Sequence, residues 1–213
     1  MKAFIISLSK IQSSKDSSIE SQEALKTIGI DAELFEGTYG NDAVDIFENE
    51  NRVLKSIDGV NSNTGKFLYP GVKGCFYSHY RLWQKCVELD EPIMIFEDDL
   101  IVYRKYTDIK FNDLLILSIN YDWMPCESLK DLLEKDNTAT SAQPYQWRFL
   151  PGASGYILSP IAAAKLVKTY SSSYLPADVA INSDLLSLQI HPQLIARSKT
   201  MAEKESMTRK KYW

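Results

Sequence analysis

The feature that most constrains this chain is an apolar run that ends in three consecutive carboxylates, within Pro92–Leu100. Residues 93–96, Ile-Met-Ile-Phe, follow a proline and are typical of a short strand buried on both faces. Glu97, Asp98 and Asp99 then lie at the end of that strand, which is the edge where α/β sheets bind ligands. Adjacent carboxylates repel each other unless a cation neutralises them, and a hard divalent cation does so with oxygen ligands. The alternative is a solvated acidic turn.

The composition is that of an ordinary globular protein. The chain has 213 residues, of which 45% are hydrophobic and 24% charged, so it can bury a real core, and disordered or collagen-like architectures are excluded. A net charge of -4 argues against a general polyanion binder, although residues 209–213 form a local basic run. We predict one domain over residues 1–197, followed by a polar, basic tail over 198–213.

The N-terminal segment and the cysteines predict a cytoplasmic location, with peripheral association at the inner face of the membrane left open. Residues 1–8 are too short for a signal-peptide core or a membrane-spanning helix, so no stable span is expected. Cys75, Cys86 and Cys126 are odd in number, lack zinc-type spacing and are expected to be reduced. Cys75 and Cys86 fall in a helical pattern, where they are expected as small core residues.

Strands and helices alternate along the chain. The expected strands are residues 3–8, 30–36, 93–96, 113–119 and 190–196. The expected helices are residues 18–28, 42–57, 75–89, 128–135, 160–170 and 176–188. This alternation predicts a single-domain α/β sandwich with a mostly parallel central sheet.

Three further clusters carry residues suited to binding or catalysis. In Gly71–Trp83, glycines at the mouth of a helix let backbone amides approach a phosphate or ribose. Ser78 and His79 of this helix could bind a nucleotide or sugar hydroxyls, or they could be ordinary polar helix residues. Small residues over 152–155 leave space for a ligand, or they form a tight turn. Asp178 lies in a first helical turn, where an acid also stabilises the helix dipole.

In this order the clusters resemble glycosyltransferase family 25, which includes lipopolysaccharide and lipooligosaccharide galactosyl- and glucosyltransferases. The matching motifs are Gly-Cys-x-x-Ser-His-x-x-x-Trp at 74–83, Glu-Asp-Asp at 97–99, Gly-x-x-Gly-Tyr-x-x-Ser at 152–159 and Pro-x-Asp at 176–178. The resemblance covers residues 3–196. It implies the nucleotide-diphospho-sugar transferase fold (GT-A-like).

The resemblance also implies an activity. The enzyme would transfer a hexose or pentose from a nucleotide-sugar donor to a hydroxyl of a lipopolysaccharide- or lipooligosaccharide-type glycan, with inversion, using Mn²⁺ or Mg²⁺. By the family pattern Asp99 is the direct metal ligand, and Glu97 the ribose or water-mediated partner on the metal. The residues implied on the donor side are Gly74, Ser78, His79, Asp98 and Gly155.

The same resemblance makes Asp178 the first candidate for the general base that takes the acceptor proton. Asp122 and Asp184 are weaker alternatives. His191 could complete the metal coordination, or it could be a polar residue at the start of a strand. One departure concerns the donor, because the arginine that usually follows the first strand is missing and the first arginine is Arg52.

Two other functions stay open. A phage-type enzyme that glycosylates hydroxymethylated bases in DNA would use the basic tail with Arg148, Arg197 and Lys199, and its affinity would fall steeply with salt. A non-catalytic sugar-nucleotide binder would have no need of three clustered carboxylates. Phosphoryl-transfer domains also end a strand in acids, but they would not explain the small residues at 152–155 or the Ser-His helix.

Overall fold

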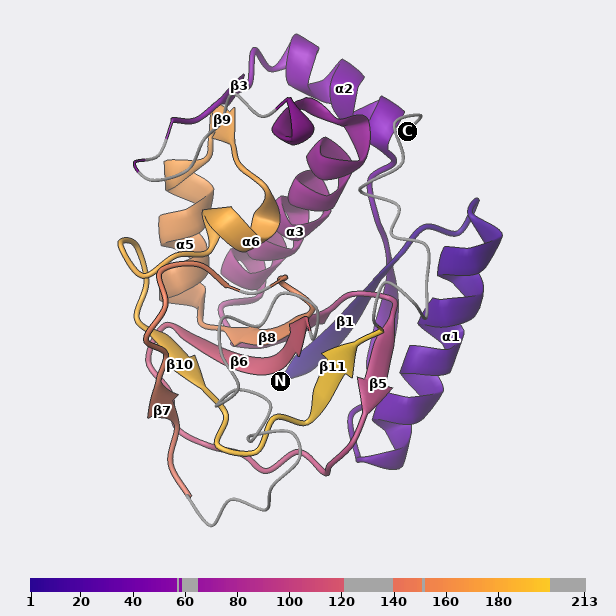
Figure 1. The fold of residues 1–213 in the computed structure, drawn as a ribbon, viewed down its shortest axis with the longest axis vertical. Coiled ribbons are helices and arrows are strands. Elements are labelled where there is room, and N and C mark those ends of the chain that lie inside the picture. Colours follow the sequence, from indigo (N-terminus) through magenta and orange to yellow (C-terminus); the bar gives the residue numbers. More distant parts are fainter. Residues whose placement is uncertain (57, 59–64, 121–139, 151, 200–213) are drawn as a thin grey trace.

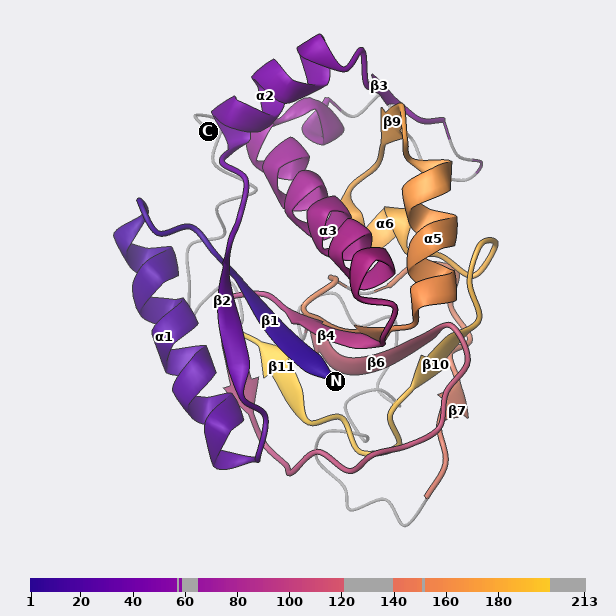
Figure 2. The same cartoon turned by 180° about the vertical axis from the view of Figure 1, so that it is seen from behind.

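A central sheet lies between two helical layers. The computed structural model describes residues 1–56, 58, 65–120, 140–150 and 152–199. Among these residues, helix α1 packs on one face of the sheet, and the other four α-helices gather on the opposite face around α3 (Figures 1 and 2). The helices are α1 (Gln12–Thr27), α2 (Gly40–Asn49), α3 (Pro70–Leu89), α5 (Pro160–Thr169) and α6 (Ala177–Ala180), with the 3₁₀ turn η2 (Lys66–Leu68) before α3.

The main sheet follows the order β2-β1-β4-β8-β6-β10-β7, and β11 joins it by pairing with β5 and β6. Its strands are β1 (Lys2–Ser7), β2 (Ala32–Glu36), β4 (Ile93–Phe96), β5 (Leu100–Val102), β6 (Leu114–Asn120), β7 (Gln143–Pro144), β8 (Gly155–Leu158), β10 (Leu188–Ile190) and β11 (Ala196–Ser198). A separate two-stranded sheet joins β3 (Val53–Leu54) to β9 (Ser173–Tyr174) in parallel.

The expectation of a mostly parallel sheet is wrong, because the sheet is mixed. Strand β1 is parallel to β2 and β4, and β6 is parallel to β10 and β11. Between these groups β8 runs antiparallel to both β4 and β6. A strand buried on both faces is a continuous apolar run whatever the direction of its neighbours, so the sequence of β8 did not reveal its orientation.

Successive side chains of the central strands point alternately into two separate hydrophobic cores. Phe4, Ile93 and Ile95 point into the core around α3, whereas Met94 and Phe96 point into the core on the α1 side. This alternation is the period of a β-strand, and it explains why β4 is apolar at every position. The same alternation sets the face of the sheet to which the next side chain, that of Glu97, points.

Helix α1 begins at Gln12, well before the expected residue 18, and three of its four buried side chains are serines. Ser14, Ser18 and Ser21 are buried at helical spacing. The Oγ atoms of Ser18 and Ser7 lie 2.8 Å apart, which ties α1 to β1. Periodicity of apolar residues cannot reveal a helix that buries serines through hydrogen bonds.

Three other expected elements are wrong in extent. The helix over 42–57 ends at Asn49 and is followed by β3. The helix over 176–188 shrinks to α6, because the Asn182 side chain donates to the carbonyls of Val179 and Ala180 at its end. The strand over 190–196 is divided into β10 and β11, since a turn containing Pro192 interrupts the ladder.

Some predictions fall beyond the part of the chain that the structure describes. These are the helix at 128–135, Asp122, Cys126 and the tail over 200–213. Of the expected tail, Ser198 belongs to β11, and the Lys199 amide donates to the Asp99 carbonyl at 2.7 Å.

Candidate active site

The acidic triplet distributes its side chains between the two faces of the sheet. Glu97 points to the α3 side, opposite to Phe96 before it, and its amide donates to the Ser154 carbonyl at 3.0 Å. Asp98 turns to α1, where its carboxylate accepts a hydrogen bond from Ser14 and its carbonyl accepts one from Ser21 at 2.8 Å. The three carboxylates therefore do not converge as one ligand group, and Asp98 fastens the acidic turn to α1.

Asp99 is only 2% exposed. It follows directly on Asp98 and precedes β5, so it lies at the same edge of the sheet as Glu97. The alternative interpretation of this segment was a solvated acidic turn, and the burial of Asp99 argues against it.

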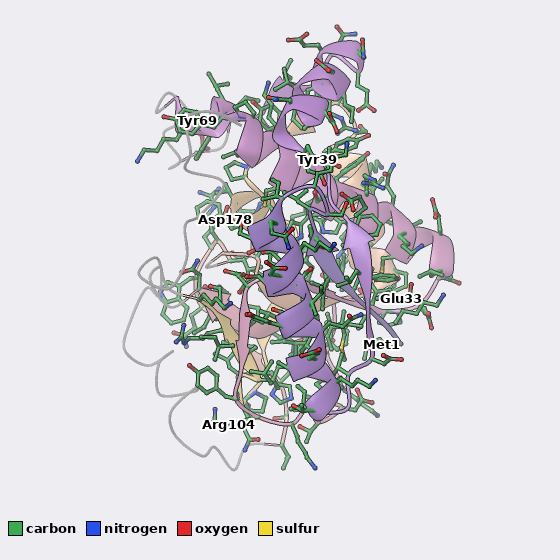
Figure 3. The ribbon with its side chains drawn as sticks, turned by 90° about the vertical axis from the view of Figure 1, so that its right-hand side faces the viewer. Met1, Glu33, Tyr39, Tyr69, Arg104 and Asp178 are labelled. Atoms are coloured by element: carbon green, nitrogen blue, oxygen red, sulfur yellow. The ribbon has the colours of Figure 1, made fainter. Side chains whose placement is uncertain are left out.

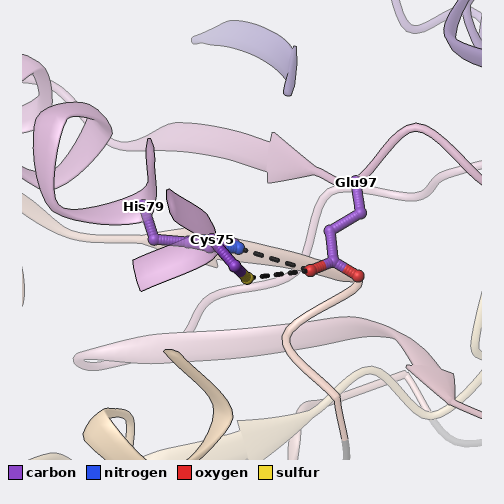
Figure 4. A group of neighbouring side chains, drawn as sticks. All are labelled: Cys75, His79 and Glu97. Atoms are coloured by element: carbon purple, nitrogen blue, oxygen red, sulfur yellow. Dashed lines mark hydrogen bonds and ion pairs between the residues drawn. The ribbon is translucent and has the colours of Figure 1, made fainter. Parts of the chain in front are cut away.

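Glu97 meets two side chains of α3, Cys75 and His79 (Figure 4). Glu97 Oε1 lies 3.6 Å from His79 Nε2 and 3.7 Å from Cys75 Sγ. Cys75 and His79 are four residues apart, which places them on the same face of the helix. Cys86 is a fully buried core residue as expected, but Cys75 is only partly buried and faces Glu97.

A hydrogen-bonded aromatic group holds the His79 ring. His79 Nδ1 lies 2.8 Å from the Tyr156 hydroxyl, which also accepts a hydrogen bond from Trp83 Nε1 at 2.9 Å. Burial raises the pKa of Tyr156 well above its usual range, so the phenol stays neutral. His79, expected on the donor side, is therefore fully buried and oriented toward Glu97.

Asp178 belongs to the same electrostatic environment. It lies in α6, which packs against α3. Burial raises the pKa of Asp178 to about 6, and the negative charge of Glu97 adds to this rise. His79 acts in the opposite direction. The structure thus brings together the expected general base and an expected metal ligand, from segments about 80 residues apart in the sequence.

The weaker candidates lie elsewhere. Asp184 is exposed and forms an ion pair with Arg148. His191 is fully buried, with Nδ1 2.5 Å from the Gln193 carbonyl and Nε2 3.1 Å from that of Thr107. His191 thus holds the Thr107 segment against β10, and within the described residues it belongs to no cluster of potential metal ligands.

Gly74 and Ser78, expected to bind the donor, hold a loop in place. A Cβ atom on Gly74 would lie 2.6 Å from the Thr38 carbonyl oxygen and 3.1 Å from the Gly40 amide nitrogen. Ser78 Oγ accepts from the Thr38 amide at 2.8 Å and donates to the Gly74 carbonyl at 2.7 Å. Both residues therefore fix the segment of residues 38–40 against α3.

Gly155 has a comparable role within the sheet. A Cβ atom there would lie 2.7 Å from Ser118 Cβ and 2.9 Å from Phe96 Cδ1. The pairing of β6 and β8 is irregular at this point, between Ile116 and Ser118. Gly155 thus permits the close packing of β8 against Ser118 and Phe96 beside the acidic turn. Direct contact of Gly155 with a donor stays a prediction.

The segment that Gly74 and Ser78 fix lines a cavity of about 530 Å³. The cavity lies over the carboxyl ends of β1 and β2, beside the end of β4 (Tyr39 in Figure 3 marks its position). Its lining residues are Ser9, Lys10, Glu36, Gly37, Thr38, Tyr39, Asp42, Ile46, Tyr77 and Arg81.

The polar side chains of this cavity form a connected group. The Tyr39 hydroxyl donates to Glu36 at 2.7 Å and accepts from the Lys10 amide at 2.7 Å. Burial would raise the pKa of Glu36, but hydrogen bonds from Tyr39 and Ser9, with the Lys10 charge, outweigh it and lower the pKa. Arg81 donates to the Glu36 carbonyl at 3.0 Å. Two carboxylates (Glu36 and Asp42) and two cations (Lys10 and Arg81) therefore border the cavity.

Sequence reasoning missed these cavity residues. The rule that α/β sheets bind ligands at their carboxyl edge was applied to β4 alone, although Lys10 and Glu36 follow or end the first two strands. Arg81 could not be found this way, because it comes from the middle of α3. It supplies an arginine at this edge even though none follows the first strand.

Comparison with known proteins assigns the family. A model described as glycosyltransferase family 25 (LPS biosynthesis protein) matches residues 1–181, most of the chain. This chain belongs to glycosyltransferase family 25. The expectation from the four motifs is confirmed at the level of the family and its enzyme class.

Two proteins of Haemophilus influenzae are similar to this family 25 chain. Lipooligosaccharide biosynthesis protein lex-1, of strain ATCC 51907 / DSM 11121 / KW20 / Rd, is 32% identical over 145 residues, which cover 59% of this chain and 45% of the relative. Lipooligosaccharide biosynthesis protein lic2B is 58% identical over 36 residues, which cover 16% of this chain and 14% of the relative. The matches thus span less than half the length of either relative.

Among the described helices, none combines the length and the apolar character needed to cross a bilayer.

Proposed function

We propose that this family 25 chain transfers a hexose or pentose from a nucleotide-sugar donor to a hydroxyl of a lipooligosaccharide-type glycan, with inversion and with a divalent cation. The observation that most supports it is that the charge of Glu97, at the end of β4, helps to raise the pKa of the buried Asp178 carboxyl to about 6, so the two acids act on each other. The two acids, which come from distant segments, would then have different roles. Glu97 would act on the departing diphosphate, and Asp178 on the acceptor hydroxyl.

The cavity suits the nucleoside part of the donor. Strands β2, β1 and β4 are adjacent and parallel, so their carboxyl ends form one continuous edge. A donor lying along this edge would place its nucleoside over β1 and β2 and its diphosphate near Glu97. The ionised Glu36 can accept hydrogen bonds from ribose hydroxyls, and Lys10 and Arg81 can approach phosphate oxygens.

The acidic turn fits a hard divalent ion of the Mg²⁺ or Mn²⁺ kind. Such ions prefer oxygen ligands, and Mg²⁺ is commonly held by one or two carboxylates together with substrate phosphates. Glu97 and Asp99 would supply these carboxylates, while Asp98 is directed to α1. When bound, the ion supplies Lewis-acid stabilisation to the nucleoside diphosphate as it leaves.

Asp178 has the properties of a general base for the acceptor hydroxyl. With a pKa of about 6 it is mostly ionised at neutral pH, yet it is a stronger base than an ordinary aspartate. It would take the hydroxyl proton as the acceptor oxygen attacks the anomeric carbon. Attack from the side opposite the leaving diphosphate inverts that carbon.

The names of the two relatives favour a lipooligosaccharide acceptor. The three described basic residues that DNA binding was expected to use do not favour DNA, since each already has a partner. Arg148 pairs with Asp184, Lys199 pairs with Glu20, and Arg197 donates to the Tyr103 hydroxyl. We therefore keep the glycan acceptor as the proposal and use modified DNA as a comparison in the test.

The test is release of nucleoside diphosphate from a panel of sugar nucleotides, with Mn²⁺ or with EDTA, and with truncated lipooligosaccharide as acceptor. We expect release from one donor, dependent on metal, and lost by at least about 100-fold in Asp99→Ala, which corresponds to roughly 2.7 kcal/mol. NMR of the product would establish the anomeric configuration.

Three outcomes would contradict parts of the proposal. Full activity in EDTA would show that transfer does not need a divalent ion. A product with retained anomeric configuration would contradict the proposed inversion. Transfer to hydroxymethylated DNA but not to the glycan would replace the acceptor.

A further inference from the structure

We propose that Cys75, His79 and Glu97 form a binding site for one Zn²⁺ ion, separate in chemistry from the all-oxygen site expected for Mn²⁺ or Mg²⁺. Their ligand atoms all lie within 4.8 Å of one another, and no other described group of three such residues does so. The proposal concerns binding of the ion itself and does not rest on the proposed sugar transfer.

The ligand types favour a borderline-soft ion. Thiolate and imidazole select Zn²⁺, whereas Mg²⁺ and Mn²⁺ are best served by carboxylates, carbonyls and water. A site of one sulfur, one nitrogen and one oxygen therefore differs from the acidic turn in the ion that it prefers, although Glu97 belongs to both.

The distances approach those of a zinc site. Tetrahedral Zn²⁺ with usual bond lengths sets its nitrogen and oxygen ligands about 3.4 Å apart, and its sulfur and oxygen ligands about 3.6 Å apart. The corresponding distances from Glu97 Oε1 are 3.6 Å to His79 Nε2 and 3.7 Å to Cys75 Sγ. Small rotations of the side chains would complete this geometry.

His79 gives the independent indication of a ligand. The residue is fully buried, and its Nε2 atom has no hydrogen-bond partner, although buried polar atoms rarely lack one. Nε2 is also the atom directed at Glu97 (Figure 4). A bound ion would occupy this nitrogen.

The surroundings of His79 match those of a metal ligand. Histidine ligands usually donate their second ring N–H to a neighbouring acceptor, which fixes the tautomer. Here Nδ1 is 2.8 Å from the Tyr156 hydroxyl oxygen, which has a lone pair for it besides the one that accepts from Trp83. Metal binding would thus use neutral His79 with its proton on Nδ1.

An ion can reach the site and keep an open position. The Glu97 side chain is 28% exposed and Cys75 is partly buried, so the cluster opens to solvent on one side. Three protein ligands plus water is the usual form of an open zinc site. The Cys75 thiol would lose its proton on binding, so one proton would be released for each ion bound.

The experiment titrates metal-free protein with Zn²⁺ against a chromophoric chelator, and repeats the titration with Co²⁺ to detect thiolate-to-metal absorption. Cys75→Ser and His79→Gln remove ligands. Cys126→Ser and Asp16→Asn are controls, because one removes a different thiol and the other an exposed carboxylate of α1 outside the cluster.

We expect one Zn²⁺ per chain in the wild type and in both controls. Affinity should fall at least about 10-fold in Cys75→Ser and His79→Gln, since loss even of a residue that supports a ligand costs 10- to 100-fold. The thiolate absorption should disappear in Cys75→Ser. Equal Zn²⁺ binding by wild type and Cys75→Ser, or no binding by the wild type, would overturn the proposal.

A circular dichroism spectrum and a urea unfolding curve keep the result interpretable if His79→Gln folds poorly. Cys75 is only partly buried and its serine variant keeps the size and polarity of the side chain, so Cys75→Ser alone decides the outcome.

Discussion

The Tyr156 hydroxyl links β8 to α3 by lying 2.8 Å from Nδ1 of His79. The same oxygen accepts the indole N–H of Trp83 at 2.9 Å, and all three side chains are fully buried. One phenol oxygen thus satisfies two polar groups of the helix that also positions Cys75. We infer that this contact sets the direction in which His79 faces Glu97.

Tyr156→Phe should lower the free energy of unfolding by about 2 to 4 kcal/mol, because it leaves two buried groups without their partner. Tyr170→Phe is the matched control. Its hydroxyl donates to the Ala180 carbonyl, which also accepts from Asn182, so about 1 kcal/mol should be lost. Urea unfolding of both variants measures the difference. Equal losses would show that the contact with His79 and Trp83 contributes nothing specific.

Gly74→Ala should destabilise the protein by about 1 to 3 kcal/mol, although alanine is the better helix former. The new methyl group would meet backbone atoms of Thr38 and Gly40, which cannot rotate away. Gly29→Ala is a useful comparison, because it has open space but a positive φ of 86° and should cost about 1 to 2 kcal/mol. A gain in stability for Gly74→Ala would contradict the close approach of α3 to the loop.

Arg81→Ala should raise the KM for the nucleotide-sugar donor by about 10-fold, near 1.4 kcal/mol, with a smaller change in kcat. The reason is that Arg81 borders the cavity and is remote from Glu97 in the proposed donor position. Lys85→Ala removes a cation one turn further along α3, where it lies over the Phe4 ring outside the cavity. An equal rise in KM for both variants would point to general electrostatic attraction.

The sequence predicted those parts of the fold whose signal is local. The strand Ile93–Phe96 was placed correctly, because four apolar residues after a proline have few other solutions. The start of α1 was missed, since the buried side chains of its first turns are serines whose partners lie in β1 and the acidic turn. Those partners are known only once the fold is known.

The candidate site, like the fold, has some features that the sequence predicted and others that it could not predict. The motifs identified Glu97 and Asp178, and the structure places them in one electrostatic environment. Neither the directions of Glu97 and Asp98 nor the meeting of Cys75 with Glu97 could be predicted, because they depend on how β4 faces two different helices. The spacing of the cysteines even argued against zinc, since two of the three ligands of the proposed site are not cysteines.

Asp178→Asn should stabilise the protein at neutral pH while abolishing transfer. The pKa of this carboxyl is about 6 in the folded state and about 4 in an unfolded chain, so the folded state binds the proton more tightly. The wild type therefore loses free energy of unfolding as pH rises from 4 to 6, by up to about 3 kcal/mol. The asparagine variant has no such proton to lose.

The measurement is the free energy of unfolding of both proteins at pH 4 to 7.5. The advantage of Asp178→Asn over the wild type should grow as pH rises through this window and then level off. Val179→Ala, on the same short helix, changes packing without removing a titratable group and should shift stability equally at every pH. An advantage of Asp178→Asn that shrinks as pH rises would mean that the folded state favours the ionised carboxylate, and the burial and the Glu97 charge would then not control this group.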